Sequence, residues 1–181
     1  MPWRNAAAIA ALVFLSAPRI LLAAEPDQPA PFRWRKVTEV ADAERVFPSA
    51  VDPNTVFVWS RGGLLVSKDD GHTFAARDKG LVQQLGAVTA LLVNPIRPAT
   101  LYAGTLAKGI FTSDDEGAAW RALGGVDQGL AGNRIHALVF SQDDPTFTTM
   151  FASHSMQQPG ISMTIDGGKT WRVFAREYGV N

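Results

Sequence analysis

Carboxylate side chains are the residues of this 181-residue sequence that most directly suggest chemistry. They occur as neighbouring pairs at Asp69–Asp70, Asp114–Asp115 and Asp143–Asp144. A glycosidase requires two carboxyl groups on either side of the sugar bond that it cleaves. Adjacent residues of a strand or hairpin point to opposite sides, so the members of one pair do not face each other across a substrate. We therefore expect these pairs to be turn residues, and a glycosidase would need carboxylates from different parts of the chain.

Histidines and glycines give no cofactor or metal signature. His72, His136 and His154 are far apart in the sequence and lack the spacing of metal ligands. His136 alternates with apolar neighbours in an expected strand, so it is the histidine most worth testing for function. No glycine-rich loop follows a strand and opens a helix, as a phosphate-binding loop would. We expect neither a metal nor a cofactor.

One twelve-residue pattern occurs three times, at 63–74, 109–120 and 160–171. In each copy a Gly stands four residues before a Ser or Thr. An Asp follows that hydroxyl residue by two positions, a second Gly by four and an aromatic residue by seven. The hydroxyl residues are 46 and 51 positions apart, which is a spacing typical of propeller blades. The residues expected to build the three loops are Ser67, Asp69, Gly71, Thr73, Phe74, Ser113, Asp115, Gly117, Trp120, Thr164, Asp166, Gly168, Thr170 and Trp171.

The pattern predicts a hairpin loop between two short strands. Its Ser, Thr and Asp side chains accept hydrogen bonds from backbone N–H groups that a tight turn leaves without partners. The second Gly supplies a positive φ, and the aromatic ring folds over the loop. Ala119 replaces Thr in the second copy and Phe74 replaces Trp in the first. The second loop should therefore lack one hydrogen bond from a hydroxyl group, and the first loop one hydrogen bond from an indole N–H. Each missing bond is worth about 1 kcal/mol.

The motif Ser/Thr-x-Asp-x-Gly-x-Thr-Trp/Phe resembles the Asp-box, or BNR repeat. This repeat occurs in sialidases, sortilin-type receptors, xyloglucan-hydrolysing enzymes and the photosystem II stability and assembly factor family. The resemblance covers about Val46 to Phe174 and implies a β-propeller. In that family the box is a structural corner at the rim of a blade, away from the central channel where ligands bind. The resemblance therefore implies a structural role for Asp69, Asp115 and Asp166.

A sialidase-like activity would also need three arginines around the substrate carboxylate and a tyrosine nucleophile. The candidates are Arg61, Arg97 and Arg134, with Tyr102 or Tyr178. The Arg-Ile-Pro signature found near the start of sialidases is absent. We expect Arg61 and Arg97 to be solvated turn residues, and Tyr102 to pack inside its blade.

Each copy of the motif is preceded by two further strand signals, separated by Pro, Asp and Asn turns. The runs 87–93 and 134–140 are continuously apolar, which predicts inner strands buried on both faces. One repeat thus holds four short strands, the content of one propeller blade. The predicted fold is all-β: a β-propeller-like array of about three four-stranded antiparallel blades.

The N-terminal segment has the features of an export signal. In residues 1–24, Arg4 precedes the apolar run 6–17, and small residues precede the expected cleavage point. Pro18 and Arg19 interrupt the run before it reaches the ~20 residues that a membrane span needs. We expect cleavage and no integral membrane span afterwards, and the alternative is an uncleaved anchor.

The rest of the chain divides into a linker and a repeat domain. Residues 25–32 contain three prolines and predict an extended linker, and the repeat domain covers 33–181. Trp34 begins a stretch similar to the strand that follows each box.

Composition narrows the range of partners. The chain has seventeen basic and seventeen acidic residues, so its formal net charge is zero. Nucleic-acid-binding proteins usually carry a basic excess, so this composition argues against nucleic acid as a partner. The absence of cysteine excludes disulfides and thiol chemistry. We expect an exported protein, either periplasmic or extracellular.

Three blades are fewer than the four to eight of closed propellers. The chain is therefore part of a longer propeller, half of a six-bladed homodimer, or a stable open array. The leading hypothesis for function is a non-catalytic binding or assembly scaffold for a protein or glycan. The alternative is a fragment of a sialidase-like or xyloglucanase-like glycoside hydrolase.

Overall fold

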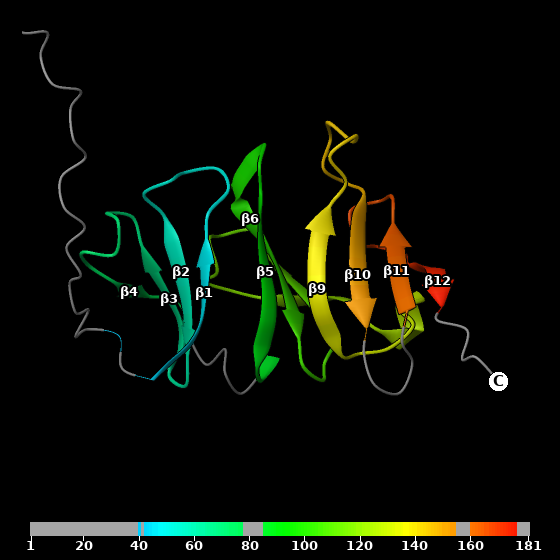
Figure 1. Cartoon of the computed structure of the whole chain (residues 1–181), viewed down its shortest axis with the longest axis horizontal. Helices are drawn as coiled ribbons and strands as arrows, with labels where there is room; N and C mark the ends of the chain where they lie inside the picture. Colours follow the sequence, from blue (N-terminus) through cyan, green and yellow to red (C-terminus); the bar gives the residue numbers. More distant parts are fainter. Residues whose placement is uncertain (1–39, 41, 78–84, 155–159, 177–181) are drawn as a thin grey trace, which may run out of the picture. The chain divides into compact units, whose positions relative to one another are not determined.

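The structure, a computed structural model, describes residues 40, 42–77, 85–154 and 160–176 (Figure 1). The chain divides into two units, Met1–Arg35 and Lys36–Asn181, and every described residue belongs to the second unit. The expected signal segment 1–24, the linker 25–32 and the strand at Trp34 all lie outside the described residues.

Three four-stranded antiparallel sheets follow one another along the chain (Figure 1). The first contains β1 (Ala43–Pro48), β2 (Val56–Ser60), β3 (Gly63–Ser67) and β4 (Ala75–Ala76). The second contains β5 (Val88–Asn94), β6 (Arg97–Thr105), β7 (Ile110–Ser113) and β8 (Arg121–Gly124). The third contains β9 (Ile135–Phe140), β10 (Met150–His154), β11 (Gly160–Thr164) and β12 (Arg172–Arg176). A 3-10 turn, η1 (Val126–Gln128), lies between the second and third sheets. The predicted fold class is confirmed.

Each sheet has two ends that differ in their connections. At one end lie the turn between its first two strands and the loop between its last two strands. We call the latter loops, residues 67–74, 113–120 and 164–171, the repeat loops. At the other end, which we call the crossing end, lie the hairpin between the middle strands and the start of the innermost strand. The crossing end is the lower one in Figure 1.

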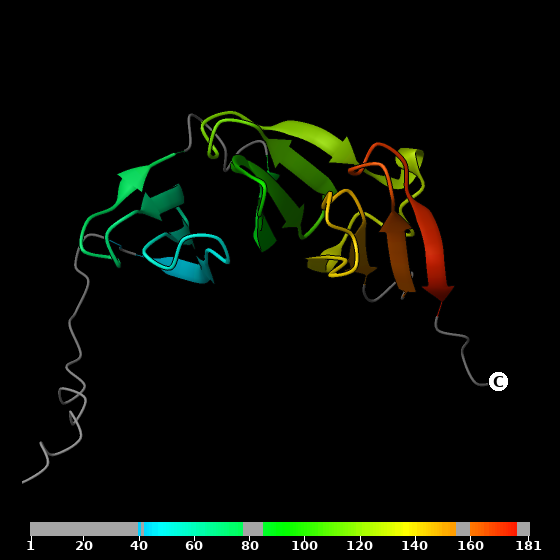
Figure 2. The ribbon, with the colours of Figure 1, turned by 90° about the horizontal axis from the view of Figure 1, so that it is seen from above.

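Two hydrophobic cores join neighbouring sheets, and Figure 2 shows the three sheets from above. The core between the first two sheets includes Phe57, Trp59, Leu64, Val66, Leu101, Phe111 and Trp120. The core between the last two includes Tyr102, Ile110, Ile135, Leu138, Met150 and Trp171. The second sheet is therefore covered on both of its faces.

Strand register explains how the second sheet serves both cores. Leu91, Ala103 and Phe111 pair across β5, β6 and β7, and all three pack in the first core. Leu92 and Tyr102 form the next row and pack in the second core. Successive residues of a strand point to opposite faces, so adjacent rows contact different neighbouring sheets.

The innermost strand of each sheet carries a β-bulge near the crossing end. The register shifts at Glu44 in β1, Thr89 in β5 and His136 in β9. An inserted residue of this kind interrupts the alternation of side chains and twists the strand. These bulges could not be predicted from the sequence, because the three positions share no residue type.

One expectation about the inner strands is wrong. The run 134–140 was predicted to be buried on both faces, yet His136 is exposed and Val139 is 51% exposed. In the part of the chain that the structure describes, no further sheet packs on the face of β9 that carries Val139. The corresponding run 87–93 lies in β5 between two sheets, and most of its residues are buried or half-buried.

Candidate functional site

The third repeat loop is held closed by side chains that bond to its own backbone. The Thr164 hydroxyl donates to Asp166 Oδ1 (2.7 Å) and accepts from the Gly168 N–H (3.0 Å). Asp166 also accepts bonds from the Thr170 N–H (3.0 Å) and from its hydroxyl (2.6 Å). These contacts give partners to N–H groups that the tight turn removes from the strand ladder.

The first repeat loop has the same arrangement. Ser67 Oγ donates to Asp69 Oδ1 (2.8 Å) and accepts from the Gly71 N–H (2.8 Å). The N–H (2.8 Å) and the hydroxyl (2.7 Å) of Thr73 both donate to Asp69. His72 is exposed and contacts the Asp69 carbonyl through Nδ1 (2.6 Å). This histidine therefore belongs to the loop itself.

The second repeat loop lacks one of these bonds, as expected from its sequence. Ser113 Oγ donates to Asp115 Oδ1 (2.8 Å) and accepts from the Gly117 N–H (2.8 Å). The Ala119 N–H donates to Asp115 (2.8 Å), but alanine has no hydroxyl to add the second bond.

The aromatic residues of the loops differ in their burial. Trp120 Nε1 donates to the Gly117 carbonyl (2.9 Å), and Trp171 Nε1 donates to the Gly168 carbonyl (3.0 Å). The two tryptophans are 8% and 6% exposed. Phe74 has no N–H for such a bond and is only half-buried.

The glycines of the repeat loops contact the preceding sheet, which the sequence did not indicate. A Cβ on Gly117 would lie 2.8 Å from Leu64 of the first sheet. A Cβ on Gly168 would lie 2.6 Å from Leu123 of the second sheet. The sequence predicted only that these glycines have a positive φ, and the observed values are 90° for Gly117 and 92° for Gly168. The repeat loops are thus contacts between sheets as well as turns.

Hydrogen bonding leaves the loop carboxylates poorly suited to acid–base catalysis. The Thr73 backbone and hydroxyl hold the pKa of Asp69 well below its usual range, and the Ala119 backbone lowers the pKa of Asp115. Burial raises the pKa of Asp166, but bonds from Thr170 and Thr164 outweigh it and bring the value to about 2. A group ionised in this way cannot donate a proton near neutral pH.

Two further acids of the pairs, Asp114 and Asp144, are engaged in an ion pair and in a turn respectively. Asp114 pairs with Arg121 (3.1 Å). Asp144 accepts bonds from Thr146 and Thr149 in the turn between β9 and β10, which lower its pKa. Among the residues that the structure describes, no three His, Asp or Glu side chains gather into a metal-binding group.

The arginines considered for a sialidase-like site do not converge. Arg61 lies in the β2–β3 hairpin at the crossing end, 3.7 Å from Glu44. Arg97 begins β6 at the opposite end of the second sheet. Tyr102 is 4% exposed and packs edge-on against Phe140, with ring centroids 5.7 Å apart. Tyr178 lies outside the described residues.

His154, rather than His136, is the histidine in a buried polar contact. Its Nε2 lies 2.9 Å from Ser162 Oγ, which accepts a bond from the Ala131 N–H (3.0 Å). Burial lowers the pKa of His154, and the Gly132 backbone opposes this shift. Its buried Nδ1 makes no well-aligned hydrogen bond to the described residues. Ser162 is fully buried and cannot reach a substrate.

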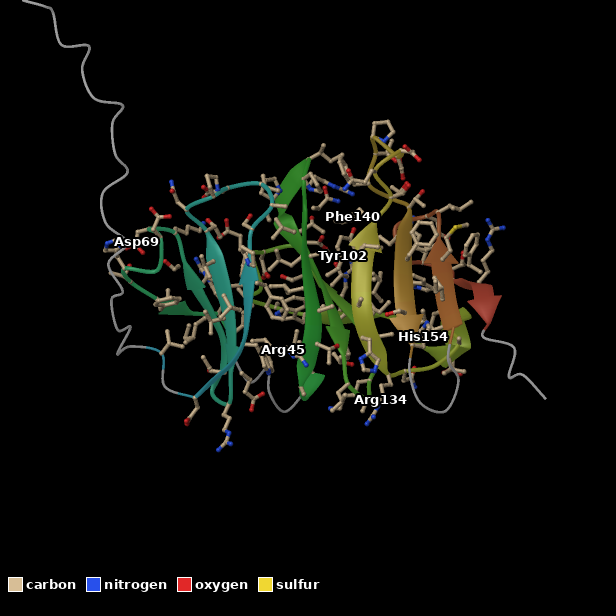
Figure 3. All side chains as sticks on the ribbon, in the orientation of Figure 1. Arg45, Asp69, Tyr102, Arg134, Phe140 and His154 are labelled. Atoms are coloured by element: carbon tan, nitrogen blue, oxygen red, sulfur yellow. The ribbon has the colours of Figure 1, made fainter. Side chains whose placement is uncertain are left out.

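The two ends of the sheets differ in charge. At the crossing end the described ionised side chains are Arg45, Arg61, Lys108 and Arg134 against Asp42 and Glu44, with Asp127 in the adjoining connection from β8 to β9. The opposite end carries Asp52, Asp69, Asp70, Asp114, Asp115, Glu116, Asp143, Asp144 and Asp166 against Lys68, Arg97, Arg121, Lys169 and Arg172. Figure 3 shows Arg45 and Arg134 in its lower half and Asp69 in its upper half. Among the described residues the crossing end thus carries a small excess of basic side chains and the opposite end an excess of acidic ones, and the crossing end is the candidate functional site.

Comparison with known proteins gives a fold and no family. No family model matches the sequence, and no curated protein matches it. Among solved structures, a GH74 enzyme from Niastella koreensis aligns with a TM-score of 0.57 at 20% identity. The GH74 xyloglucanase from Xanthomonas campestris aligns with a TM-score of 0.51 at 21% identity. YCF48 bound to D1 peptide aligns with a TM-score of 0.51 at 11% identity.

These alignments cover most of this chain but a minor part of the others. The Niastella koreensis enzyme aligns over 74% of this chain and 22% of its own length. The Xanthomonas campestris xyloglucanase aligns over 77% of this chain and 24% of its own length. YCF48 aligns over 74% of this chain and 44% of its own length. At such low identity the likeness shows the fold alone, a partial β-propeller-like array. In the part of the chain that the structure describes, no helix is both long and apolar enough to cross a bilayer.

Proposed function

We propose that this chain is an exported, non-catalytic binding or assembly scaffold built from Asp-box repeats. Its partner is a protein segment rich in acidic side chains, bound at the crossing end. The observation that carries the proposal is the charge difference between the two ends of the sheets. Basic side chains on one surface attract an acidic ligand and speed its association.

Two further observations support a binding role over catalysis. The repeat-loop carboxylates are bonded to their own loops, so they hold the scaffold together. YCF48, which shares the fold, has been solved with a bound peptide, so this kind of scaffold is able to hold a protein segment.

Fluorescence anisotropy with a labelled ten-residue glutamate-rich peptide tests the proposal. Arg45→Glu combined with Arg61→Glu should weaken binding at least about tenfold, because two attractive charges become repulsive. Arg97→Glu, which makes the same kind of change at the opposite end, should leave binding nearly unchanged. Equal weakening by both variants, or no binding by the unmodified protein, would refute the crossing end as the site.

The second candidate function is a fragment of a glycoside hydrolase, favoured by the similarity to GH74 enzymes. Its test is turnover of xyloglucan oligosaccharides and aryl glycosides. Glu44, on the β1 bulge, is the carboxylate to replace, since it lies on an innermost strand. Turnover that is lost in Glu44→Gln and kept in Asp115→Ala would overturn the scaffold proposal.

A further inference from the structure

A row of three aromatic rings fills the space between the second and third sheets, at the end opposite to the crossing end. Tyr102 of β6 packs edge-on against Phe140 of β9, with ring centroids 5.7 Å apart (Figure 3). Phe140 packs in the same way against Phe147 in the β9–β10 turn, with ring centroids 5.6 Å apart. Tyr102 is buried and Phe147 is half-buried. These rings therefore close this part of the contact between the two sheets.

The contact between the first and second sheets has a smaller residue at the position of the middle ring. Val93 pairs with Leu101, as Phe140 pairs with Met150. Leu101 and Met150 are equivalent, because each also pairs with the hydroxyl residue that begins the next repeat loop. Val93 packs against the core shared with the first sheet, just as Phe140 packs against the core shared with the second. A valine thus stands in place of a phenylalanine.

A proline stands in place of the outer ring. The residue after Pro98 is Ala99, whose carbonyl accepts a hydrogen bond from the N–H of Glu116 (2.9 Å). The carbonyl of the residue after Phe147 accepts the corresponding bond from the N–H of Gly167 (2.9 Å). Glu116 and Gly167 are equivalent, since each is the third residue after the hydroxyl residue of its motif. Pro98 is therefore the counterpart of Phe147.

A cavity of about 110 Å³ lies where these smaller residues leave the space between the first two sheets unfilled. Phe57, Val93 and Pro98 all line it. Phe57 is the counterpart of Tyr102, because each pairs with the residue that precedes the hydroxyl residue of its motif. An enclosed apolar cavity of about 150 Å³ binds benzene. This cavity is smaller but partly open to solvent, so it has room for one benzene-sized ring.

The polar side chains of the cavity favour a positive charge beside that ring. Asp52 lines the cavity, and its carboxylate accepts bonds from the Thr55 hydroxyl (2.6 Å) and the Asn54 N–H (3.0 Å). These two bonds hold the pKa of Asp52 below its usual value. Each carboxylate oxygen can accept a further bond. Lys68 also lines the cavity, but its ammonium is bound to both carboxylate oxygens of Glu116 (2.8 Å).

We propose that this cavity binds a small molecule that carries one aromatic ring and a positively charged amine. The ring lies edge-on to Phe57, as Phe140 lies to Tyr102. The ammonium group donates a charge-assisted hydrogen bond to Asp52. The site is at the end opposite to the crossing end, so it is separate from the proposed binding of an acidic protein segment.

NMR titration of the full chain with phenethylamine tests the ring site. The unmodified chain should bind one molecule saturably. Val93→Phe supplies a ring from within the chain, as Phe140 does in the third sheet, so it should weaken binding at least about tenfold. The same variant should raise the midpoint of thermal unfolding, because it fills a cavity, and this rise shows that it is folded. Val139→Phe is the matched control at a site that is 51% exposed in β9, and its binding should be unchanged.

Two further probes and one variant test the charge. Phenylacetate has the ring with a negative group, and butylamine has the amine without a ring, so each should bind at least about tenfold more weakly than phenethylamine. Asp52→Asn keeps an oxygen for the Asn54 N–H but loses the charge, so it should also weaken phenethylamine binding. No saturable binding of phenethylamine, equal binding of phenylacetate, or undiminished binding by folded Val93→Phe would overturn the proposal.

Discussion

The first and third repeat loops have the same internal hydrogen bonds but different surroundings. In both, a hydroxyl and a carboxylate bind backbone N–H groups of the loop. Trp171 is buried, and its backbone N–H donates to the Gln128 carbonyl (2.8 Å) in the connection from the second sheet. Phe74 is half-buried, and no described sheet precedes it.

The difference shows that the motif specifies two separate structural features. Its polar residues specify the turn, which forms in every copy. Its glycine and ring specify a contact with the preceding sheet, which the described residues show for the second and third copies. Substitutions in the third loop should therefore cost more stability than the same substitutions in the first loop.

Replacing the ring should give the largest effect. Trp171→Ala should lower the free energy of unfolding by about 4 kcal/mol, because it empties a site between two sheets. Phe74→Ala should cost about half as much, since Phe74 is less buried. Urea denaturation of both variants measures the two values, and equal losses would show that the two rings are equally packed.

Replacing the second glycine of the motif should come next. Gly168→Ala places a Cβ 2.6 Å from Leu123 at a φ of 92°, so we expect a loss of about 3 kcal/mol. Gly71→Ala has a φ of 75°, and among the described residues its Cβ would meet the Phe74 ring at 3.6 Å, an ordinary van der Waals distance, so we expect a smaller loss of about 1 kcal/mol from backbone strain. Thermal denaturation of the two variants measures both losses of stability. A larger loss for Gly71→Ala than for Gly168→Ala would contradict the contact between Gly168 and the second sheet.

The crossing ends of the first and third sheets should differ in pH dependence. Ser60 in β2 occupies the position of His154 in β10, and its hydroxyl donates to the Gly63 carbonyl (3.1 Å). Burial lowers the pKa of His154 below 6.5, so the unfolded chain binds this proton more readily. Stability should therefore be complete above pH 6.5 and fall as the pH drops below it.

Urea denaturation between pH 7.5 and 5.5 tests this expectation. His154→Gln should flatten the pH dependence, and His136→Gln serves as the control, because His136 is exposed. An unchanged slope in His154→Gln would show that His154 is not the group responsible.

Much of the fold followed from local chemistry. Apolar runs bounded by Pro, Asp and Asn turns predicted the first two strands of each sheet, and the repeated motif predicted the loop between the last two. The polar network at His154 could not be predicted, because it depends on Ser162 and on the connection between sheets. The basic crossing end was also missed, since its arginines are far apart in the sequence and the net charge is zero.

The smallest expected effect is a gain of stability in the second loop. Ala119→Thr should restore the hydroxyl bond that Thr73 and Thr170 make to their aspartates. The residue is exposed, so we expect a gain of about 0.5 kcal/mol. Denaturation midpoints compared with Ala119→Val, which adds a similar volume without a hydroxyl, would reveal it. An equal gain in both variants would show that the hydroxyl bond is not its source.

A double-mutant cycle between Gly124 and Trp171 tests most directly whether a repeat loop stabilises the contact between its own sheet and the preceding sheet. A Cβ on Gly124, in the second sheet, would lie 2.6 Å from Trp171 Nε1. Gly124→Ala should therefore cost about 2 kcal/mol in the unmodified protein and little in Trp171→Ala, where the ring is gone. The same cost in both backgrounds would mean that the ring does not lie against the second sheet.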